Sequence, residues 1–253
     1  RTHGQAAVPI TFGLKVAVWV DEFRRHMERL DELAPRATTG KFLGAVGTGA
    51  AQGDRAIELQ SLILTELGLE IPVATTQVVG RDRYIEWVGW MSNVATSIEK
   101  ILQEVRNLQR SEIGEVAESF DVEKQVGSST MAHKKNPIKS ENASGLARIV
   151  RSFIIPTYEN ALLWHERDLA NSSSERFTLS HASALAEDVM AKTADVLTNM
   201  WVDKERCLAN IHAQRGLVMA EKVMIELVDH GVPRDEAHEV LREASFTALA
   251  NGE

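Results

Sequence analysis

Hydrophobic residues recur along this chain mostly at the spacing of α-helices. One set of apolar side chains stands three, four or seven positions apart, namely Phe12, Val16, Trp19, Phe23, Leu30 and Leu33, and a longer run extends from Tyr84 to Val105. Residues spaced in this way share one face of an α-helix, whereas strand residues alternate with a period of two. Both runs therefore predict long amphipathic helices.

Several further segments show the same spacing. Helices are predicted at 54–67, 146–154, 179–200, 215–229 and after Pro233. Gly231, just before that proline, is typical of the end of a helix, and proline is tolerated in a first helical turn. The stretch IPVATTQVV at 71–79 is either a strand or an extended connection.

These segments predict an all-α fold, a bundle of long helices. We expect a central helical-bundle domain over residues 1–210 and the beginning of a smaller helical domain over residues 211–253. The apolar faces are broader than one chain of this kind usually buries, and a spacing near seven residues is typical of helices that associate. The pattern therefore favours an oligomer with a shared helical core.

Composition narrows the classes of partner. The chain has 253 residues, of which 44% are hydrophobic and 25% charged, as in a soluble globular protein with a substantial core. Asp and Glu number 36 against 28 Lys and Arg, a formal charge of −8. Nucleic acids and anionic membranes are bound through an excess of basic residues, so neither is an expected partner. No apolar run approaches the ~20 residues of a membrane span and no secretory signal opens the chain, so we expect a cytoplasmic location.

The same inventory limits the chemistry. A single cysteine, Cys207, excludes an intrachain disulfide and a cysteine-rich metal site, and no HExxH spacing occurs. Neither a GxGxxG loop nor a Walker-type loop is present, which argues against enzymes that use dinucleotides or nucleoside triphosphates. We therefore expect no metal and no cofactor.

Three polar segments interrupt the helical pattern. They are RTHGQAAVP at 1–9, GSSTMAHKKNPIKSEN at 127–142 and LWHERDLANSSSER at 163–176, and TTQVVGRDRY at 75–84 is a weaker fourth. Taken singly, each is explained by an ordinary role such as a helix cap or solvated lysines. Their occurrence together in a helical scaffold favours a functional site.

A definite chemistry fits these segments. A serine acts as a base only where cations and oriented donors stabilise its alkoxide, and Lys134 lies six residues after Ser128. Lys134 and Asn136 suit a carboxylate that gains charge when the neighbouring carbon loses a proton. A histidine with a carboxylate partner can protonate a leaving group, and two arginines separated by serines suit a phosphate.

The polar segments also carry a family resemblance. GSSTMAHKKNP resembles the GSSxMPxKxNP loop of the fumarase/aspartase superfamily, and RTHGQAAVPITFG resembles a second block of that superfamily. WHERDLANSSSER is similar to the segment typical of the adenylosuccinate lyase family, and the helical pattern fits from residue 1 to about 210. The resemblance implies a C–N lyase of purine biosynthesis, which eliminates fumarate from adenylosuccinate to leave AMP and from SAICAR to leave AICAR.

Residue roles follow from this resemblance, position by position. Ser128 matches the general base that takes a proton from the succinyl carbon, and His3 matches the general acid that protonates the departing purine nitrogen. Glu141 matches the glutamate that polarises this histidine, and Lys134 and Asn136 would hold the carboxylate as its charge develops. Substrate-binding roles are implied for Thr2 and Ser129 at the fumarate moiety, for Gln77, and for Arg167, Ser172 and Arg176 at the phosphate and ribose.

The resemblance further implies a homotetramer in which three subunits share each active site, so that 127–142 and 163–176 serve different sites. The expected partner is a small molecule, a succinyl-purine nucleotide. Ala132 stands where the family has proline, which implies a more flexible loop. Compared with the family pattern, we expect the N-terminal domain to be absent from this sequence and the C-terminal domain to be truncated. We therefore expect a piece of a longer polypeptide, and the activity of this piece alone stays open.

Two alternatives stay open. One is another member of the superfamily, a carboxymuconate cycloisomerase or an argininosuccinate lyase, but a substrate without phosphate has no use for Arg167 and Arg176 together. The other is a non-catalytic structural protein on the same scaffold. Such a protein would not require all five of the predicted reacting residues, which are His3, Ser128, Lys134, Asn136 and Glu141.

Overall fold

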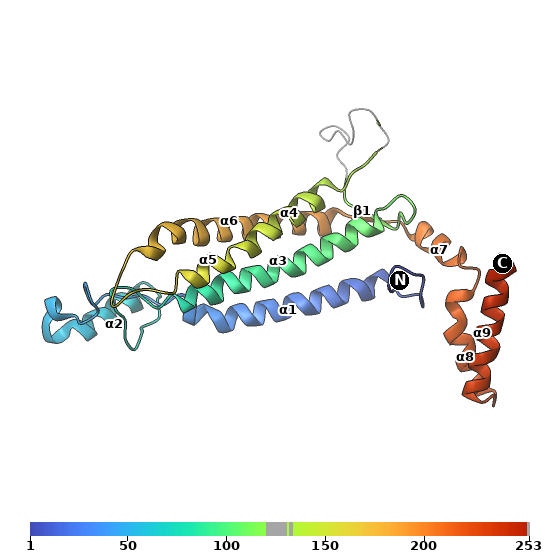
Figure 1. Cartoon of the computed structure of the whole chain (residues 1–253), viewed down its shortest axis with the longest axis horizontal. Coiled ribbons are helices and arrows are strands. Elements are labelled where there is room, and N and C mark those ends of the chain that lie inside the picture. Colours follow the sequence, from blue (N-terminus) through green and yellow to red (C-terminus); the bar gives the residue numbers. More distant parts are fainter. Residues whose placement is uncertain (120–130, 132–133, 252–253) are drawn as a thin grey trace. The chain divides into compact units, whose positions relative to one another are not determined.

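The longest apolar runs form the longest helices (Figure 1). These helices are α1 (Phe12–Ala37), α3 (Asp82–Leu108) and α6 (Ala170–Asn199), in a computed structural model that describes residues 1–119, 131 and 134–251. The hydroxyl of Thr11 caps α1 by accepting a hydrogen bond from the Leu14 amide at 3.1 Å. Periodicity and a local cap therefore account for α1, as the sequence predicts.

Shorter elements complete the fold. They are η1 (Ala50–Arg55), α2 (Ala56–Glu66), β1 (Val116–Ala117), α4 (Ile138–Ser152), α5 (Ile154–Glu159), β2 (Trp201–Val202), α7 (Lys204–His212), η2 (Leu217–Met219), α8 (Ala220–Asp229) and α9 (Arg234–Asn251). Across the described ranges the strands are β1 and β2, which pair antiparallel and have two residues each, so the all-α prediction is confirmed. None of the helices in these ranges has the length and hydrophobicity needed to cross a membrane.

Two expected segments differ in detail from the structure. Residues 71–79 form no strand and belong to the loop between α2 and α3, so the connection was the correct alternative. The apolar run at 146–154 is divided, because α4 ends at Ser152 and α5 begins at Ile154. Pro156 explains the break: it lacks an N–H, and its ring clashes with the carbonyl of Ser152 four residues earlier in a continuous helix.

The chain divides into two compact units. The bundle unit comprises Trp19–Asn107 and Glu118–Met200, and the terminal unit comprises Arg1–Val18, Leu108–Ala117 and Trp201–Glu253. The elements of the bundle unit run side by side, with α1, α3, α4, α5 and α6 lengthwise and α2 at one end (Figure 1).

The core of the bundle unit is built around α3 and the contact between α4 and α6. Every apolar position of the predicted α3 stripe from Val88 to Val105 is at most 2% exposed. The helices α4 and α6 pack along their length. Their buried faces include the small residues Ala143, Ala147, Ala182 and Ala186, which allow a close approach of the two helices.

A buried polar chain joins α1 to α3. His26 is 3% exposed, and its Nε2 lies 2.8 Å from the hydroxyl of Ser97, which in turn donates to the Glu22 carboxylate at 2.5 Å. Lys100 pairs with the other oxygen of Glu22. Burial is the main reason that the pKa of His26 lies below its ordinary value. The neutral imidazole is therefore part of the native packing of these helices.

The terminal unit includes a helical hairpin of α8 and α9. Gly231 has a φ of 92°, a conformation that glycine adopts without strain, and it ends α8 as predicted. Pro233 directly precedes α9, where its missing N–H costs no helical hydrogen bond. Asp203 caps α7 by accepting a hydrogen bond from the Arg206 amide at 2.9 Å.

Candidate active site

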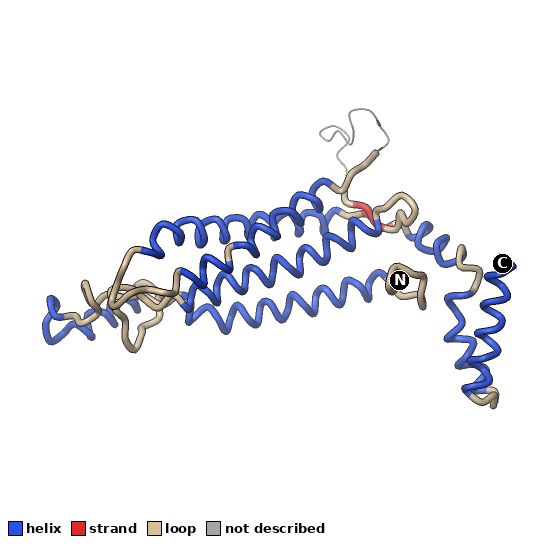
Figure 2. Tube along the Cα trace, viewed as in Figure 1, coloured by secondary structure: helices blue, strands red, loops and turns tan. Residues whose placement is uncertain are grey.

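Two of the predicted polar segments meet at one end of the bundle unit. The loops between α2 and α3 and between α5 and α6 lie together there (Figure 2). The amide of Gln77 donates a hydrogen bond to the carbonyl of Glu166 at 3.2 Å, which joins the two loops directly. The structure therefore brings Gln77 close to the segment that contains Arg167, although 90 residues separate them in sequence.

The Arg167 guanidinium, at this end of the bundle, has two donor atoms without a hydrogen-bond acceptor in the described part of the chain. Its Nε and Nη1 atoms are buried and find no hydrogen-bond acceptor among the described residues. Buried polar groups in native proteins are nearly always paired, so two orphaned N–H donors on one cation indicate the place of an absent acceptor. A guanidinium group is the cation best suited to a phosphate or a carboxylate, since its N–H groups can contact two oxygens at once.

A near-buried ion pair fastens the same two segments. The side chains of Arg81 and Glu175 are 11% and 14% exposed, and Arg81 Nη2 donates to Glu175 Oε2 at 3.1 Å. The same oxygen accepts a hydrogen bond from Asn171 Nδ2 at 2.7 Å, and Arg81 Nη1 donates to the Val79 carbonyl at 2.8 Å. Sequence analysis assigned no role to Arg81 and Asn171. The local sequence RDRY marks Arg81 as part of a polar segment, but it does not reveal the ion pair, because Glu175 lies 94 residues away.

The start of α6 presents the remaining predicted nucleotide-binding residues. Asp168 accepts hydrogen bonds from the amides of Trp164 and Ala170, and these bonds lower the pKa of its carboxyl group. Ser172 is half-buried and Arg176 is exposed. They are four residues apart in α6, so they lie on one face of its first turns. Two of the three predicted phosphate and ribose contacts thus share one surface.

The predicted carboxylate-binding residues and Glu141 belong to the opposite end of the bundle unit, where α4 begins (Figure 1). Lys134 is exposed, Asn136 is half-buried, and Glu141 lies exposed in the first turn of α4. Ser128 and Ser129, like Ala132, lie outside the described residues. Within one chain, therefore, the structure separates Lys134, Asn136 and Glu141 from the group around Arg167.

The predicted general acid lies in the terminal unit, on a tight turn. Thr2 and Gln5 exchange backbone hydrogen bonds of 3.0 and 2.8 Å, and the two residues between them, His3 and Gly4, have φ values of 52° and 77°. This is the left-handed geometry of a type I′ turn, which is uncommon for a residue with a Cβ atom. The turn presents His3 to solvent.

The turn is anchored by an ion pair at its base. Both terminal nitrogens of the Arg1 guanidinium donate to the Glu115 carboxylate, at 2.9 and 2.7 Å, and Asn210 donates to it at 2.8 Å. Burial tends to raise the pKa of Glu115, but these hydrogen bonds and the charge of Arg1 outweigh it and lower the pKa. The anchored turn fixes the backbone on both sides of His3.

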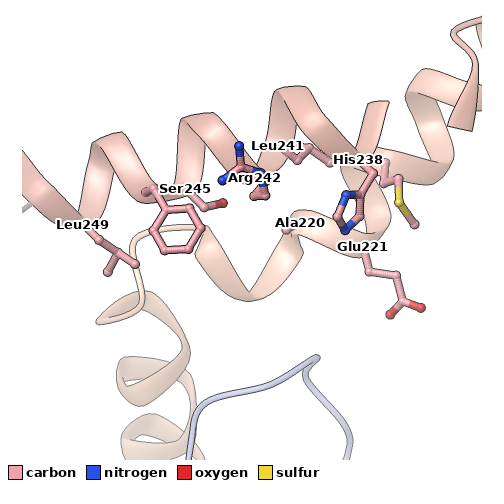
Figure 3. Close-up of a pocket in the computed structure, with 9 residues that line it drawn as sticks. Ala220, Glu221, His238, Leu241, Arg242, Ser245 and Leu249 are labelled. Carbon is pink, nitrogen blue, oxygen red and sulfur yellow. The ribbon is translucent and has the colours of Figure 1, made fainter. Parts of the chain in front are cut away.

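A pocket of about 360 Å³ lies between α8 and α9, lined by residues that include Met224, His238, Leu241 and Phe246 (Figure 3). It contains none of the predicted site residues, so it does not mark the predicted chemistry. Over the described ranges, no three His, Cys, Asp or Glu side chains are grouped as metal ligands would be.

Comparison with known proteins links these features to a family. Residues 1–152 match the family model described as Lyase, and residues 216–253 match the one described as Adenylosuccinate lyase C-terminus. The adenylosuccinate lyase of Methanothermobacter thermautotrophicus is 46% identical over 252 residues, which cover 100% of this chain and 56% of the relative. That of Bacillus subtilis is 39% identical over 248 residues, 98% of this chain and 57% of the relative.

Solved structures agree with these matches. A fumarate lyase from Mesorhizobium sp. BNC1 superposes with a TM-score of 0.88 at 31% identity, covering 100% of this chain and 55% of that one. The 3-carboxy-cis,cis-muconate lactonizing enzyme of Pseudomonas putida gives the same TM-score at 32% identity, with the same coverage. The chain thus spans just over half the length of the proteins it matches.

Proposed function

The chain belongs to the lyase family, within the fumarase/aspartase superfamily, and on this premise we propose that the full-length protein is an adenylosuccinate lyase. It cleaves a C–N bond by β-elimination, converting adenylosuccinate to AMP and fumarate, and SAICAR to AICAR and fumarate. Two kinds of support favour this over the other superfamily activities and over a non-catalytic role. Relatives at 46–47% identity are adenylosuccinate lyases, and a C-terminal match to the same enzyme is present.

The observation that carries the choice of substrate is the orphaned guanidinium of Arg167. Both succinyl-purine substrates bear a phosphate, whereas argininosuccinate and carboxymuconate bear none. A phosphate supplies the acceptors that Arg167 Nε and Nη1 lack, and Ser172 and Arg176 on the adjoining turns of α6 add a hydroxyl and a second guanidinium. Gln77, joined to this segment by a backbone hydrogen bond, contributes an amide to the same substrate.

We propose the following division of the chemistry. Ser128 removes a proton from the succinyl carbon next to a carboxylate, and Lys134 and Asn136 stabilise the charge that this carboxylate gains in the aci-carboxylate intermediate. His3, polarised by Glu141, then protonates the purine nitrogen as the C–N bond breaks and fumarate forms. Thr2 and Ser129 bind the fumarate moiety. The left-handed turn that presents His3 supports its role, since strained backbone persists most often at functional sites.

We also propose that the active site is completed by other copies of the chain, in a homotetramer. The supporting observation is that the group around Arg167 and the group around Lys134 lie at opposite ends of the bundle unit. Large apolar side chains left exposed on the bundle helices offer surfaces for association. They include Val20, Met27, Ile149, Ile155 and Phe177, each between 47% and 65% exposed. A cytoplasmic location remains a prediction from sequence.

The test is substrate choice by the full-length protein. Fumarate release is measured with adenylosuccinate and argininosuccinate offered separately at equal concentration, and lactone formation is measured with 3-carboxymuconate, whose cyclisation releases no fumarate. We expect release from adenylosuccinate alone, because only this substrate places a phosphate at Arg167. Release from argininosuccinate but not from adenylosuccinate would replace the proposed function with that of a different superfamily member.

A further inference from the structure

The start of α4 has no cap of its own. The helix begins at Ile138, directly after Pro137, whose side chain carries no hydrogen-bond acceptor. The first N–H groups of a helix have no partner within it and must be satisfied from outside. Here the Ile138 amide donates to the Asn136 carbonyl at 2.9 Å, and the Glu141 amide begins the helical pattern with Pro137 at 2.9 Å. The amides of Lys139 and Ser140 remain to be satisfied.

Glu118 supplies the missing acceptors. Its Oε1 accepts from the Lys139 amide at 3.0 Å, and its Oε2 accepts from the Ser140 amide at 3.0 Å and from the Ser140 hydroxyl at 2.8 Å. Glu118 is 5% exposed and Ser140 is fully buried. The carboxylate thus acts as a cap from 21 and 22 residues away, where a helix normally uses a residue next to its first turn.

Electrostatics favours this arrangement. The amide dipoles of a helix place partial positive charge at its N-terminus, so an anion is stabilised there. The Lys139 side chain is not involved, since its ammonium group pairs with Asp195 of α6. Two backbone amides and the Ser140 hydroxyl thus donate to Glu118, and its carboxylate in turn satisfies the first turn of α4.

The capped turn is also the turn that presents predicted site residues. Lys134 and Asn136 lie in the segment that leads directly into it, and Glu141 follows Ser140 within it. We propose that Glu118 is a positioning residue for the elimination. Its carboxylate fixes the N-terminus of α4, and thereby the placement of Lys134 and Asn136 against the carboxylate of the substrate and of Glu141 toward its partner. This inference rests on the proposed function.

Glu99 provides a matched control. It too is a buried carboxylate, 7% exposed, and it too ties α4 in place, because it accepts a hydrogen bond from Arg148 at 3.0 Å and pairs with Arg151. These contacts are on the later turns of α4, beyond the capped first turn. A change at Glu99 therefore loosens the same helix without releasing its N-terminus.

The experiment compares Glu118→Ala, Glu118→Gln and Glu99→Ala in the full-length protein, with kcat, KM and Tm measured for each. We expect Glu118→Ala to lower kcat on the order of 10- to 100-fold, as misplacement of stabilising groups by about 1 Å does, with a much smaller change in KM. Glu118→Gln keeps one carbonyl oxygen as acceptor and should give an intermediate kcat. Glu99→Ala should lower Tm and leave kcat near that of the wild type.

Two results would overturn the proposal: a wild-type kcat in Glu118→Ala, or equal losses of kcat in Glu118→Ala and Glu99→Ala, which would reduce Glu118 to a general stabiliser of α4. If Glu118→Ala does not fold, Glu118→Asp decides, because its carboxylate is one methylene short of the two amides. A lowered kcat in that variant supports the proposal, and an unchanged kcat refutes it. Failure of the wild-type protein to release fumarate from adenylosuccinate is a separate result, which would refute the proposed function itself.

Discussion

At the scale of single residues, an N–H donor buried without an acceptor costs on the order of 1–3 kcal/mol, and Arg167 has two buried donor atoms that meet no acceptor within residues 1–119, 131 and 134–251. Folding alone gains nothing from this arrangement. A ligand that supplies the acceptors recovers the cost on binding, so the same atoms that weaken the unbound fold strengthen the complex.

Replacing Arg167 should therefore affect substrate binding more than turnover. We expect Arg167→Met to raise KM for adenylosuccinate roughly 10- to 100-fold, the value of one or two charge-assisted hydrogen bonds, with a smaller change in kcat. Steady-state kinetics of the full-length protein measure both constants. Arg24→Met, at an exposed position of α1, is the control and should leave both unchanged. An unchanged KM in Arg167→Met would remove the argument for a phosphate at this position.

His26 makes the stability of the protein depend on pH. Burial lowers its pKa in the folded state, the nearby Arg29 lowers it further, and the charge of Glu22 opposes them; in the unfolded chain the pKa returns to about 6.5. Between the two values the unfolded chain binds more protons than the folded one. The contribution of neutral His26 is thus complete above about pH 6.5 and is lost as pH falls below it.

The expected result is a fall in Tm between pH 7.5 and pH 5.5 that is smaller in His26→Gln than in the wild type. His230→Gln changes an exposed histidine and should keep the wild-type dependence. Differential scanning calorimetry at the two pH values measures each Tm. An equal fall in Tm for the wild type and His26→Gln would show that other groups cause the dependence.

At the scale of elements, the pair of Arg81 and Glu175 joins the loop before α3 to the first turns of α6. Removing one member of a buried ion pair leaves the other charge unpaired, which is why such changes cost more than the pair itself is worth. The loss would also remove one of the contacts between the segment that contains Gln77 and the segment that contains Arg167, and leave the backbone hydrogen bond from Gln77 to Glu166.

We expect Arg81→Met to lower the free energy of unfolding by on the order of 3 kcal/mol and to raise KM for adenylosuccinate. Urea denaturation and steady-state kinetics provide the two readings. Arg55→Met removes an arginine from the exposed pair with Glu58, and it should change neither quantity appreciably. If Arg81→Met lost stability but kept the wild-type KM, the pair would support the fold without organising the substrate site.

The long helices could be predicted from the sequence because the spacing of Val88, Met91 and Ile98 records which face of α3 is buried. The short helix α5 and the paired strands were missed, since two to six residues are too few to show a period. Helix α6 begins at Ala170, nine residues before the apolar run at 179–200, and its first turns contain the predicted residues Ser172 and Arg176. The first turns of α6 are polar, so the spacing of apolar residues does not predict them.

The residues of the candidate site also differ in how far the sequence alone could predict them. Motif residues such as Lys134 and Arg167 could be identified from local sequence, because each lies in a segment with a family resemblance. Glu118 and Arg81 could not, because each acts on a partner that only the fold brings near. Local sequence therefore offers candidates for substrate contact, whereas the contacts that hold these candidates in place become visible only in the fold.

At the scale of the whole molecule, the bundle unit does not bring together the predicted site residues that the structure describes in it. The bundle unit places its two groups at opposite ends, Thr2 and His3 belong to the terminal unit, and Ser128 and Ser129 lie outside the described residues. Each unit combines separate stretches of the sequence. The division of the chain into domains near residue 210 stays a prediction from sequence. This separation of the predicted site residues is the reason for proposing that different copies of the chain complete each active site.

The most direct test of this account is the release of fumarate from adenylosuccinate by the full-length wild-type protein and by Ser128→Ala, with the oligomeric state of both measured by analytical ultracentrifugation. We predict that the wild type turns over as a tetramer and that Ser128→Ala keeps the tetramer but loses kcat by on the order of 10³, as expected when base catalysis is removed. A folded wild-type tetramer that releases no fumarate, or a Ser128→Ala variant with near-wild-type kcat, would contradict it.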